Sequence, residues 1–286
     1  MTPAASVLPT AYGPLAGLRV ERPGQPRVIA LHGWLDNAAS FLPLLPHMPM
    51  LDLLLLDSPG HGHSAHLPSG AEYTLSTYIH ALFDAADAVG WERFAVLGHS
   101  MGAAVAALAA VAQPQRISRL ALIETIGPLA EDENAAPERL RQAIGASRTL
   151  RNKHLRVFPD LEVAVRARLQ ASPMEPASAR LLVERGTRAV PGGHVWSSDP
   201  RLTLPGAQRM TEAQVQALLR ALDRPVHVLH ARAAQPYFPA AQREARLALL
   251  PQAEVSVLEG GHHLHMDQPA AVAAAFSVFL AAPDRA

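Results

Sequence analysis

Residues 98–102 read GHSMG, a G-x-S-x-G pattern that is typical of a serine nucleophile on a sharp strand-to-helix turn. The surrounding sequence agrees with this interpretation. An apolar run typical of a buried strand ends at Leu97, and a helical pattern of small residues begins at Met101. The backbone of such a turn is strained, and small residues two positions before and after the serine avoid clashes. The pattern predicts that Ser100 is a nucleophile.

A serine hydroxyl is a poor nucleophile at neutral pH and needs a general base. We expect His262 to be this base, because it follows the apolar run 255–258 and two glycines and directly precedes the last predicted helix. A loop at this position could bring an imidazole over the edge of a sheet. His263 is the main alternative, since sequence separates neighbouring histidines poorly.

The base in turn needs a carboxylate that orients its imidazole. Residues 231–238 follow a predicted strand but contain no acidic side chain, whereas Glu124 ends the apolar run 120–123. We therefore predict Glu124 as the acid, in the chain order Ser100, Glu124, His262. The alternatives for the acid are Glu259 and Asp267, and Glu124 could instead pair with an arginine.

Developing negative charge on a substrate oxygen needs preorganised donors. We expect the backbone N–H of Met101 to be one donor, since it opens a helix whose N-terminus favours anions. The second is expected from the backbone N–H of Trp34, in the loop after the strand 28–31. The side chains of Trp34 and His99 are predicted to contact substrate.

Three histidines in one loop, His61, His63 and His66, could suggest a metal centre. A hydrolytic site of the HxHxDH type needs an aspartate just before the third histidine, and Ala65 stands there. We expect no metal and no cofactor. Asp57 and His61 are expected to brace this turn through hydrogen bonds to the backbone.

Short apolar runs alternate with helical patterns in the first half of the chain, which indicates a mostly parallel sheet with crossover helices. We predict strands over residues 16–20, 28–31, 50–56, 94–97 and 120–123, and a helix over 74–89. Strand signals nearly vanish over 128–223 and return at 226–230 and 255–258. The expected organisation is a core domain of 1–127 and 224–286 with a helical cap, or lid, of 128–223.

Composition excludes several classes of protein. The chain has 286 residues, 25 basic and 25 acidic side chains and no cysteine, so it lacks the basic excess that nucleic-acid binding needs and cannot use thiolate chemistry. We expect no secretory signal at the start, and the uncharged run 94–112 is better explained as a strand and a helix than as a membrane span. We expect a cytoplasmic protein, monomeric or homodimeric.

Four motifs resemble the α/β-hydrolase superfamily, and their order and spacing match it over residues 25–280. They are LHGW at 31–34, DSPGHGHS at 57–64, GHSMG at 98–102 and GGHHLHMDQP at 260–269. Other stretches, LIETIGPL at 122–129 among them, look similar to the serine hydrolase-like branch. The resemblance implies a mostly parallel eight-stranded sheet with helices on both faces and a helical cap. It also implies that Ser100 is the nucleophile and His262 the base, and that Met101 and Trp34 supply the oxyanion donors.

The expected function is hydrolysis of a small carboxylic ester or thioester through an acyl-serine intermediate. Dehalogenases and epoxide hydrolases of this fold use an aspartate where Ser100 stands, so the resemblance argues against those activities. Carbon–carbon bond hydrolysis, cofactor-free haloperoxidase activity and a non-catalytic ligand-binding role are the alternatives.

Overall fold

A computed structural model describes residues 3–150 and 156–283. Its central feature is an eight-stranded sheet with the strand order β1-β2-β4-β3-β5-β6-β9-β10. The strands are β1 (Ala4–Leu8), β2 (Leu15–Val20), β3 (Arg27–Leu31), β4 (Asp52–Leu56), β5 (Phe94–His99), β6 (Ile117–Ile123), β9 (Val226–Ala231) and β10 (Glu254–Leu258). The six strands from β4 to β10 in this order pair in parallel, and β2 pairs antiparallel with both neighbours. The predicted fold class is confirmed.

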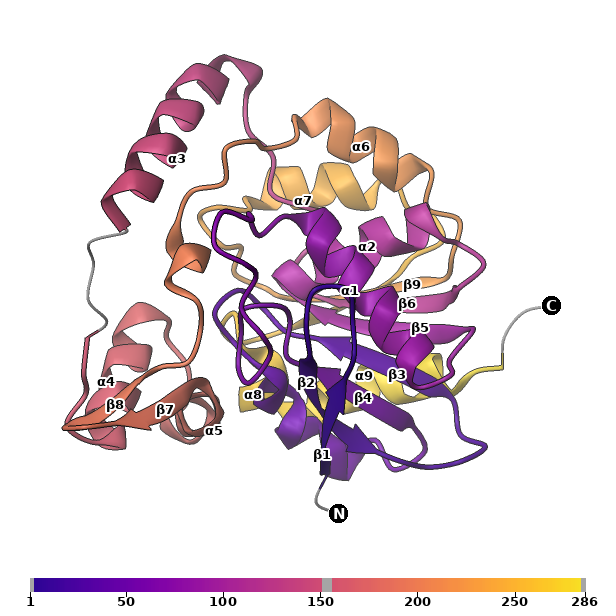
Figure 1. Ribbon diagram of the computed structural model, residues 1–286. Coiled ribbons are helices and arrows are strands. Elements are labelled where there is room, and N and C mark those ends of the chain that lie inside the picture. The colour runs from indigo at the N-terminus through magenta and orange to yellow at the C-terminus, as the bar shows by residue number, and fades with distance from the viewer. Residues whose placement is uncertain (1–2, 151–155, 284–286) are drawn as a thin grey trace.

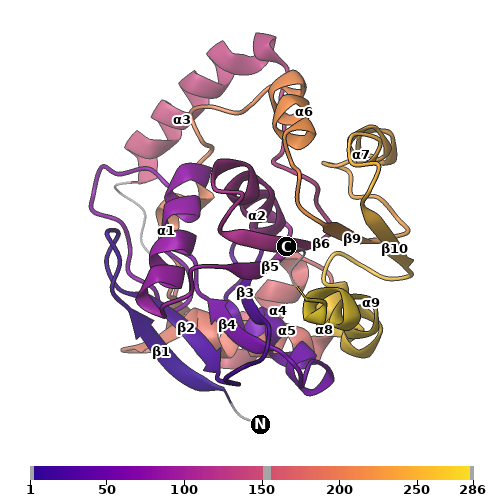
Figure 2. The ribbon, with the colours of Figure 1, turned by 90° about the vertical axis from the view of Figure 1, so that its right-hand side faces the viewer.

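Helices cover both faces of this sheet (Figure 2), because its central strands are buried on both sides. In β3, Ile29 and Leu31 belong to one apolar core, and Val28 and Ala30 belong to the other. The first core includes residues of α1 (Leu75–Ala88), α2 (Met101–Ala112) and α6 (Glu212–Arg220), and α7 (Ala240–Leu247) packs against it. The second includes the 3-10 helix η1 (Ala38–His47), α8 (Leu264–Asp267) and α9 (Pro269–Ala281).

The helix α1 begins where the sequence predicts. The side chain of Thr74 accepts a hydrogen bond from the backbone N–H of Thr77, which is a standard N-cap. Tyr78, Ala81 and Leu82 then form a buried stripe. The uncharged run 94–112 is divided between β5 and α2, and within the described residues no helix is long and apolar enough to cross a membrane.

The segment between β6 and β9 contributes no strand to the large sheet. It contains η2 (Glu133–Ala135), α3 (Ala136–Leu150), α4 (Leu161–Ala171), α5 (Pro176–Gly186), β7 (Thr187–Val190), β8 (Gly193–Trp196), η3 (Pro200–Thr203) and α6. Figure 1 shows α4, α5 and the β7–β8 hairpin gathered beside the sheet, with α3 projecting from the body.

Two parts of this segment pack differently. The helices α4 and α5 share a small core of their own, which includes Phe158, Val165 and Val183. In contrast, Val215 and Leu219 of α6 pack into the main core.

Candidate active site

The loops that follow the parallel strands all open at the same edge of the sheet, where open α/β sheets place their sites. Trp34 follows β3, Ser100 follows β5, Glu124 follows β6 and His262 follows β10. The topology therefore brings to one edge residues that are far apart in the sequence.

Ser100 lies on a sharp turn between β5 and α2, with φ 52° and ψ −114°. A Cβ atom on Gly98 would lie 2.6 Å from the backbone of Ala103, and one on Gly102 would lie 2.0 Å from the carbonyl oxygen of Leu31. Neither position can accept a side chain without moving the backbone. These contacts explain the two glycines of the GHSMG motif.

Backbone strain is concentrated around this turn. Among the described residues other than glycine, positive φ angles occur at Leu35 (60°), Ser100 (52°) and Glu124 (71°). Residues other than glycine rarely adopt this backbone conformation. It persists only where the surrounding structure enforces it, commonly at functional sites. All three residues follow strands of the large sheet at the edge described above.

Glu124 contacts the imidazole of His262. Its Oε2 atom lies 3.1 Å from Nδ1 of His262, and its Oε1 atom accepts a hydrogen bond from the backbone N–H of Ala231. Gln235 donates a longer hydrogen bond to Oε2. Glu124 is 5% exposed, so the pair lies largely out of water. A carboxylate beside Nδ1 holds the proton on that nitrogen and leaves Nε2 as the basic atom.

Tyr237 also reaches His262. Its hydroxyl lies 3.3 Å from Nδ1 and 3.4 Å from Nε2 of the same ring, and the two rings are nearly perpendicular. Burial, followed by the charge of Glu124, raises the pKa of Tyr237 to about 12. The tyrosine is therefore a neutral hydroxyl at the edge of the imidazole.

His99 is predicted to contact substrate, but the structure places its side chain in the protein interior. Its side chain is 1% exposed, and its Nε2 donates a hydrogen bond of 2.9 Å to the backbone carbonyl of His262. The two rings pack with centroids 4.7 Å apart. The side chain of the residue before the nucleophile thus points into the protein, which argues against contact with a substrate. His99 instead holds the backbone of His262 against the β5–α2 turn.

His263, the alternative base, has a different environment. It is 3% exposed, and its Nε2 lies 3.3 Å from Asp36 Oδ2. Arg168 of α4 donates a hydrogen bond to the other oxygen of Asp36. Burial would raise the pKa of Asp36, but His263 and Arg168 together hold this pKa well below its usual range. Thus the structure brings His262, and not His263, to Glu124.

The two other carboxylates considered for the acid role are engaged elsewhere. Glu259 is exposed and pairs with Arg232. Asp267 accepts a hydrogen bond from Ser178 in α5. Neither interaction involves the imidazole of His262.

The two predicted oxyanion donors lie near the same edge. Met101 opens α2, where the first backbone N–H groups have no partner within the helix. Trp34 follows β3 and is 53% exposed, and its indole N–H donates a hydrogen bond of 2.9 Å to the carbonyl oxygen of Leu202. The indole therefore connects the loop after β3 with η3 of the 128–223 segment.

Asp57 braces the loop after β4 and also contacts α5. It is fully buried and accepts hydrogen bonds from the backbone N–H groups of Ala38 and His63. The Arg185 guanidinium contacts both of its carboxylate oxygens, one of them at 2.7 Å. His61 contacts the backbone carbonyl of Pro59. The predicted bracing of this turn is confirmed.

The histidines of that loop point to different environments. His61 is fully buried beside His32, whereas His66 is exposed and contacts Ser197 and Asp199. The described part of the chain instead has a cluster of potential metal ligands at Asp36, His99 and His263. Sequence reasoning missed Asp36, Arg168 and Tyr237, and the position of Asp36 directly after the LHGW loop was the available signal for one of them.

The model of the α/β hydrolase fold family matches residues 26–269, which includes all the strands from β3 to β10 and the elbow turn. The chain belongs to this family. A serine hydrolase-like protein 2 from Homo sapiens is 30% identical over 94% of this chain and 89% of its own length. A serine hydrolase-like protein from Danio rerio is 29% identical over 96% of this chain and 87% of its own. These similarities place the chain in the serine hydrolase-like branch.

A solved structure extends the comparison to nearly the whole chain. The selenomethionine-substituted hypothetical protein from Pseudomonas aeruginosa PAO1 is 41% identical, with a TM-score of 0.92. The match covers 99% of this α/β hydrolase and 100% of that chain. The similarity therefore includes the segment between β6 and β9 as well as the sheet.

Proposed function

We propose that this α/β hydrolase cleaves a small carboxylic ester or thioester, with Ser100 as nucleophile, His262 as base and Glu124 as the orienting acid. The contact between Glu124 and the Nδ1 edge of His262 carries the proposal. It leaves Nε2 as the nitrogen that can accept a proton. The strained turn at Ser100 and the His99 hydrogen bond, which holds the backbone of His262 beside that turn, support the same assignment.

Acylation would proceed by attack of the Ser100 Oγ atom on the substrate carbonyl carbon while His262 Nε2 takes the hydroxyl proton. The backbone N–H groups of Trp34 and Met101 would donate hydrogen bonds to the oxygen that becomes negative. Breaking of the bond to the leaving group then yields an acyl-serine. The imidazolium gives its proton to the departing alcohol oxygen or thiol sulfur.

Deacylation would repeat these steps with water as the nucleophile. His262 takes one proton from the water as its oxygen attacks the acyl carbon, and the same donors hold the new oxyanion. The bond to Ser100 breaks, and the proton returns to its Oγ atom. The products are a carboxylic acid and free enzyme, so no external oxidant or reductant is required.

We further propose that residues 128–223, apart from α6, which packs into the main core, act as a cap over this edge and select the substrate. The separate core of α4 and α5 supports this division. Contacts that join the cap to the loops of the site include Arg185 with Asp57, Arg168 with Asp36, and Trp34 with Leu202. In this proposal the cap covers the acyl group of the substrate, with the Trp34 indole at its border.

The substrate class can be tested with p-nitrophenyl esters of increasing acyl length and thioesters of the same acids. We expect turnover that is highest for short acyl groups, and Ser100→Ala should lower kcat by roughly 10^4-fold to 10^6-fold. The control is the circular dichroism spectrum of the variant, which should match that of the wild type. Absence of turnover for every ester and thioester, or equal rates for the folded variant, would contradict the proposal.

A further inference from the structure

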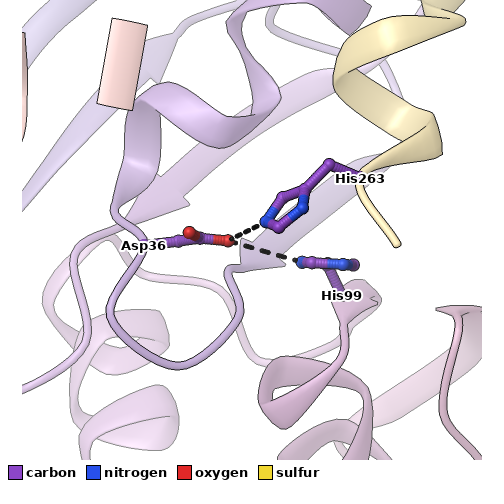
Figure 3. Close-up of side chains that lie close together, drawn as sticks. All are labelled: Asp36, His99 and His263. Carbon is purple, nitrogen blue, oxygen red and sulfur yellow. Dashed lines mark hydrogen bonds and ion pairs between the residues drawn. The ribbon is translucent and has the colours of Figure 1, made fainter. Parts of the chain in front are cut away.

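Behind the candidate active site, three buried side chains direct potential metal-ligand atoms toward one another. Asp36 Oδ2 lies 3.3 Å from His263 Nε2 and 3.7 Å from His99 Nδ1 (Figure 3). The three atoms all lie within 4.8 Å of one another, and each side chain is at most 3% exposed. The cluster joins the loop after β3, the end of β5 and the loop after β10.

One atom of this cluster lacks a hydrogen-bond partner. His99 Nε2 donates to the carbonyl of His262, so a neutral His99 carries a lone pair on Nδ1. Nδ1 of His99 is one of the described buried side-chain atoms that have no hydrogen-bond partner. It faces a carboxylate oxygen, and two acceptors that face each other call for a cation between them.

The remaining atoms of these side chains are already oriented by other groups, as is common around bound metals. His99 donates its second ring nitrogen to a backbone carbonyl. His263 Nδ1 lies 3.5 Å from the hydroxyl of Ser172. Asp36 Oδ1 accepts a hydrogen bond from Arg168, which leaves Oδ2 for the shared space.

Gly33 keeps that space open. A Cβ atom at this position would lie 2.9 Å from His99 Nδ1 and 3.1 Å from Asp36 Oδ2. Any larger residue would crowd the two atoms that face each other. The glycine of the LHGW motif therefore borders the cluster as well as the predicted oxyanion loop.

We propose that Asp36, His99 and His263 form a binding site for a single divalent transition metal of the zinc or cobalt type. Two imidazole nitrogens and a carboxylate oxygen are ligands that such ions prefer. Bond lengths of roughly 2.0–2.1 Å in a tetrahedral site separate ligand atoms by about 3.4 Å. The observed separations of 3.3 and 3.7 Å from Asp36 Oδ2 are close to this value. A water molecule would complete the site.

Binding requires only a local change of protonation. The metal would take the place of the Nε2 hydrogen that faces Asp36, and the ring hydrogen would then lie on Nδ1, facing Ser172. The Arg168 guanidinium lies 3.4 Å from that Nε2 and opposes a second cation, which favours reversible over permanent binding. The site is distinct from the proposed triad, although His99 and His263 directly adjoin Ser100 and His262 in the sequence.

The test is titration of chelator-treated protein with Co²⁺, followed by visible absorption, and with Zn²⁺, followed by the midpoint of thermal unfolding. We expect a saturable d–d band of tetrahedral intensity at one equivalent of Co²⁺ and a higher midpoint with Zn²⁺. Wild-type protein that shows neither response would overturn the proposal without any variant. This result would leave the hydrolase proposal intact, because that proposal uses no metal.

Variants locate the site. His263→Asn removes Nε2 but keeps an amide facing Ser172, and it should weaken Co²⁺ binding by about 100-fold or more. Asp36→Asn should weaken Co²⁺ binding by a similar factor, and it replaces His263→Asn in the test if that variant does not fold. His80→Asn, at an exposed histidine, and His262→Asn should bind as the wild type does. The assignment of the metal ligands would be overturned if His263→Asn kept the Co²⁺ band while either control variant lost it.

Discussion

Glu124 Oε2 lies 3.1 Å from His262 Nδ1, although 138 residues separate the two in the chain. The acid follows β6, and the segment after the neighbouring strand β9 has no carboxylate at this point. The end of β9 and the segment after it instead supply donors, since the Ala231 N–H and the Gln235 amide both bind Glu124. Glu124, which follows β6, thus orients His262, and donors from β9 and the loop after it hold Glu124 in place.

Glu124→Gln tests this relationship directly. The amide has nearly the same shape, but it cannot both keep the Ala231 hydrogen bond and accept a proton-bearing Nδ1 as a carboxylate does. His262 then loses its required tautomer, so we expect kcat to fall by roughly 10^3-fold to 10^4-fold. Ester hydrolysis and the thermal midpoint should be measured together. Unchanged turnover in a folded variant would show that the orienting acid is another residue.

His262→Asn and His263→Asn form a matched pair of neighbouring substitutions. The first removes the imidazole that faces Glu124, and we expect it to lower kcat by roughly 10^4-fold to 10^6-fold. The second alters the buried contact with Asp36 and should leave most of the turnover. Rates on a short-chain aryl ester distinguish the two. The reverse order of effects would make His263 the base.

Arg185→Met tests how the cap is held to the loop after β4. The substitution leaves the fully buried Asp57 without its cationic partner. Removing one partner of a buried pair costs about 3–5 kcal/mol, so we expect the free energy of unfolding to fall by about 3 kcal/mol. The control is Arg180→Met on the same helix, whose pair with Glu162 is exposed. That change should leave the free energy of unfolding close to the wild-type value.

Urea unfolding of the wild type and of the two variants measures these differences in the free energy of unfolding. A loss in Arg185→Met no larger than that in Arg180→Met would mean that the Asp57 contact contributes little to stability.

Buried histidines make stability depend on pH. Burial lowers the pKa of His61 and of His265 to about 3. Since the unfolded chain titrates near pKa 6.5, it binds protons that the folded chain excludes as the pH falls below that value. Each residue should therefore cost about 2 kcal/mol of stability between pH 7 and pH 5. Chemical unfolding across this range should show the decline, and stability that stays constant or rises on acidification would contradict it.

Much of the sheet could be predicted because its strands are long apolar runs. The runs ending at Leu31, Leu56 and Ile123 correspond to β3, β4 and β6. In contrast, β1 was missed, since its residues are mostly exposed at the antiparallel edge and lack a buried pattern. The β7–β8 hairpin was missed for a similar reason, because only Thr187 and Val195 in it are buried.

At the site, motifs predicted residues that act through local backbone geometry. The GHSMG pattern identified the strained turn of Ser100, since its glycines are required by contacts with Ala103 and Leu31. Contacts that depend on how distant loops meet could not be predicted. Asp36 pairs with Arg168 across 132 residues, and no local pattern marks Arg168 as its partner. The same reason explains why the burial of His99 against the loop of His262 could not be predicted.

The most direct measurement is covalent labelling by a fluorophosphonate, followed by mass spectrometry of the intact chain and of its peptides. The proposal predicts one adduct per chain, located on Ser100, with labelling abolished in Ser100→Ala and strongly slowed in His262→Asn. A folded protein that remains unlabelled, or that carries its adduct on another residue, would contradict the assignment of Ser100 as an activated nucleophile.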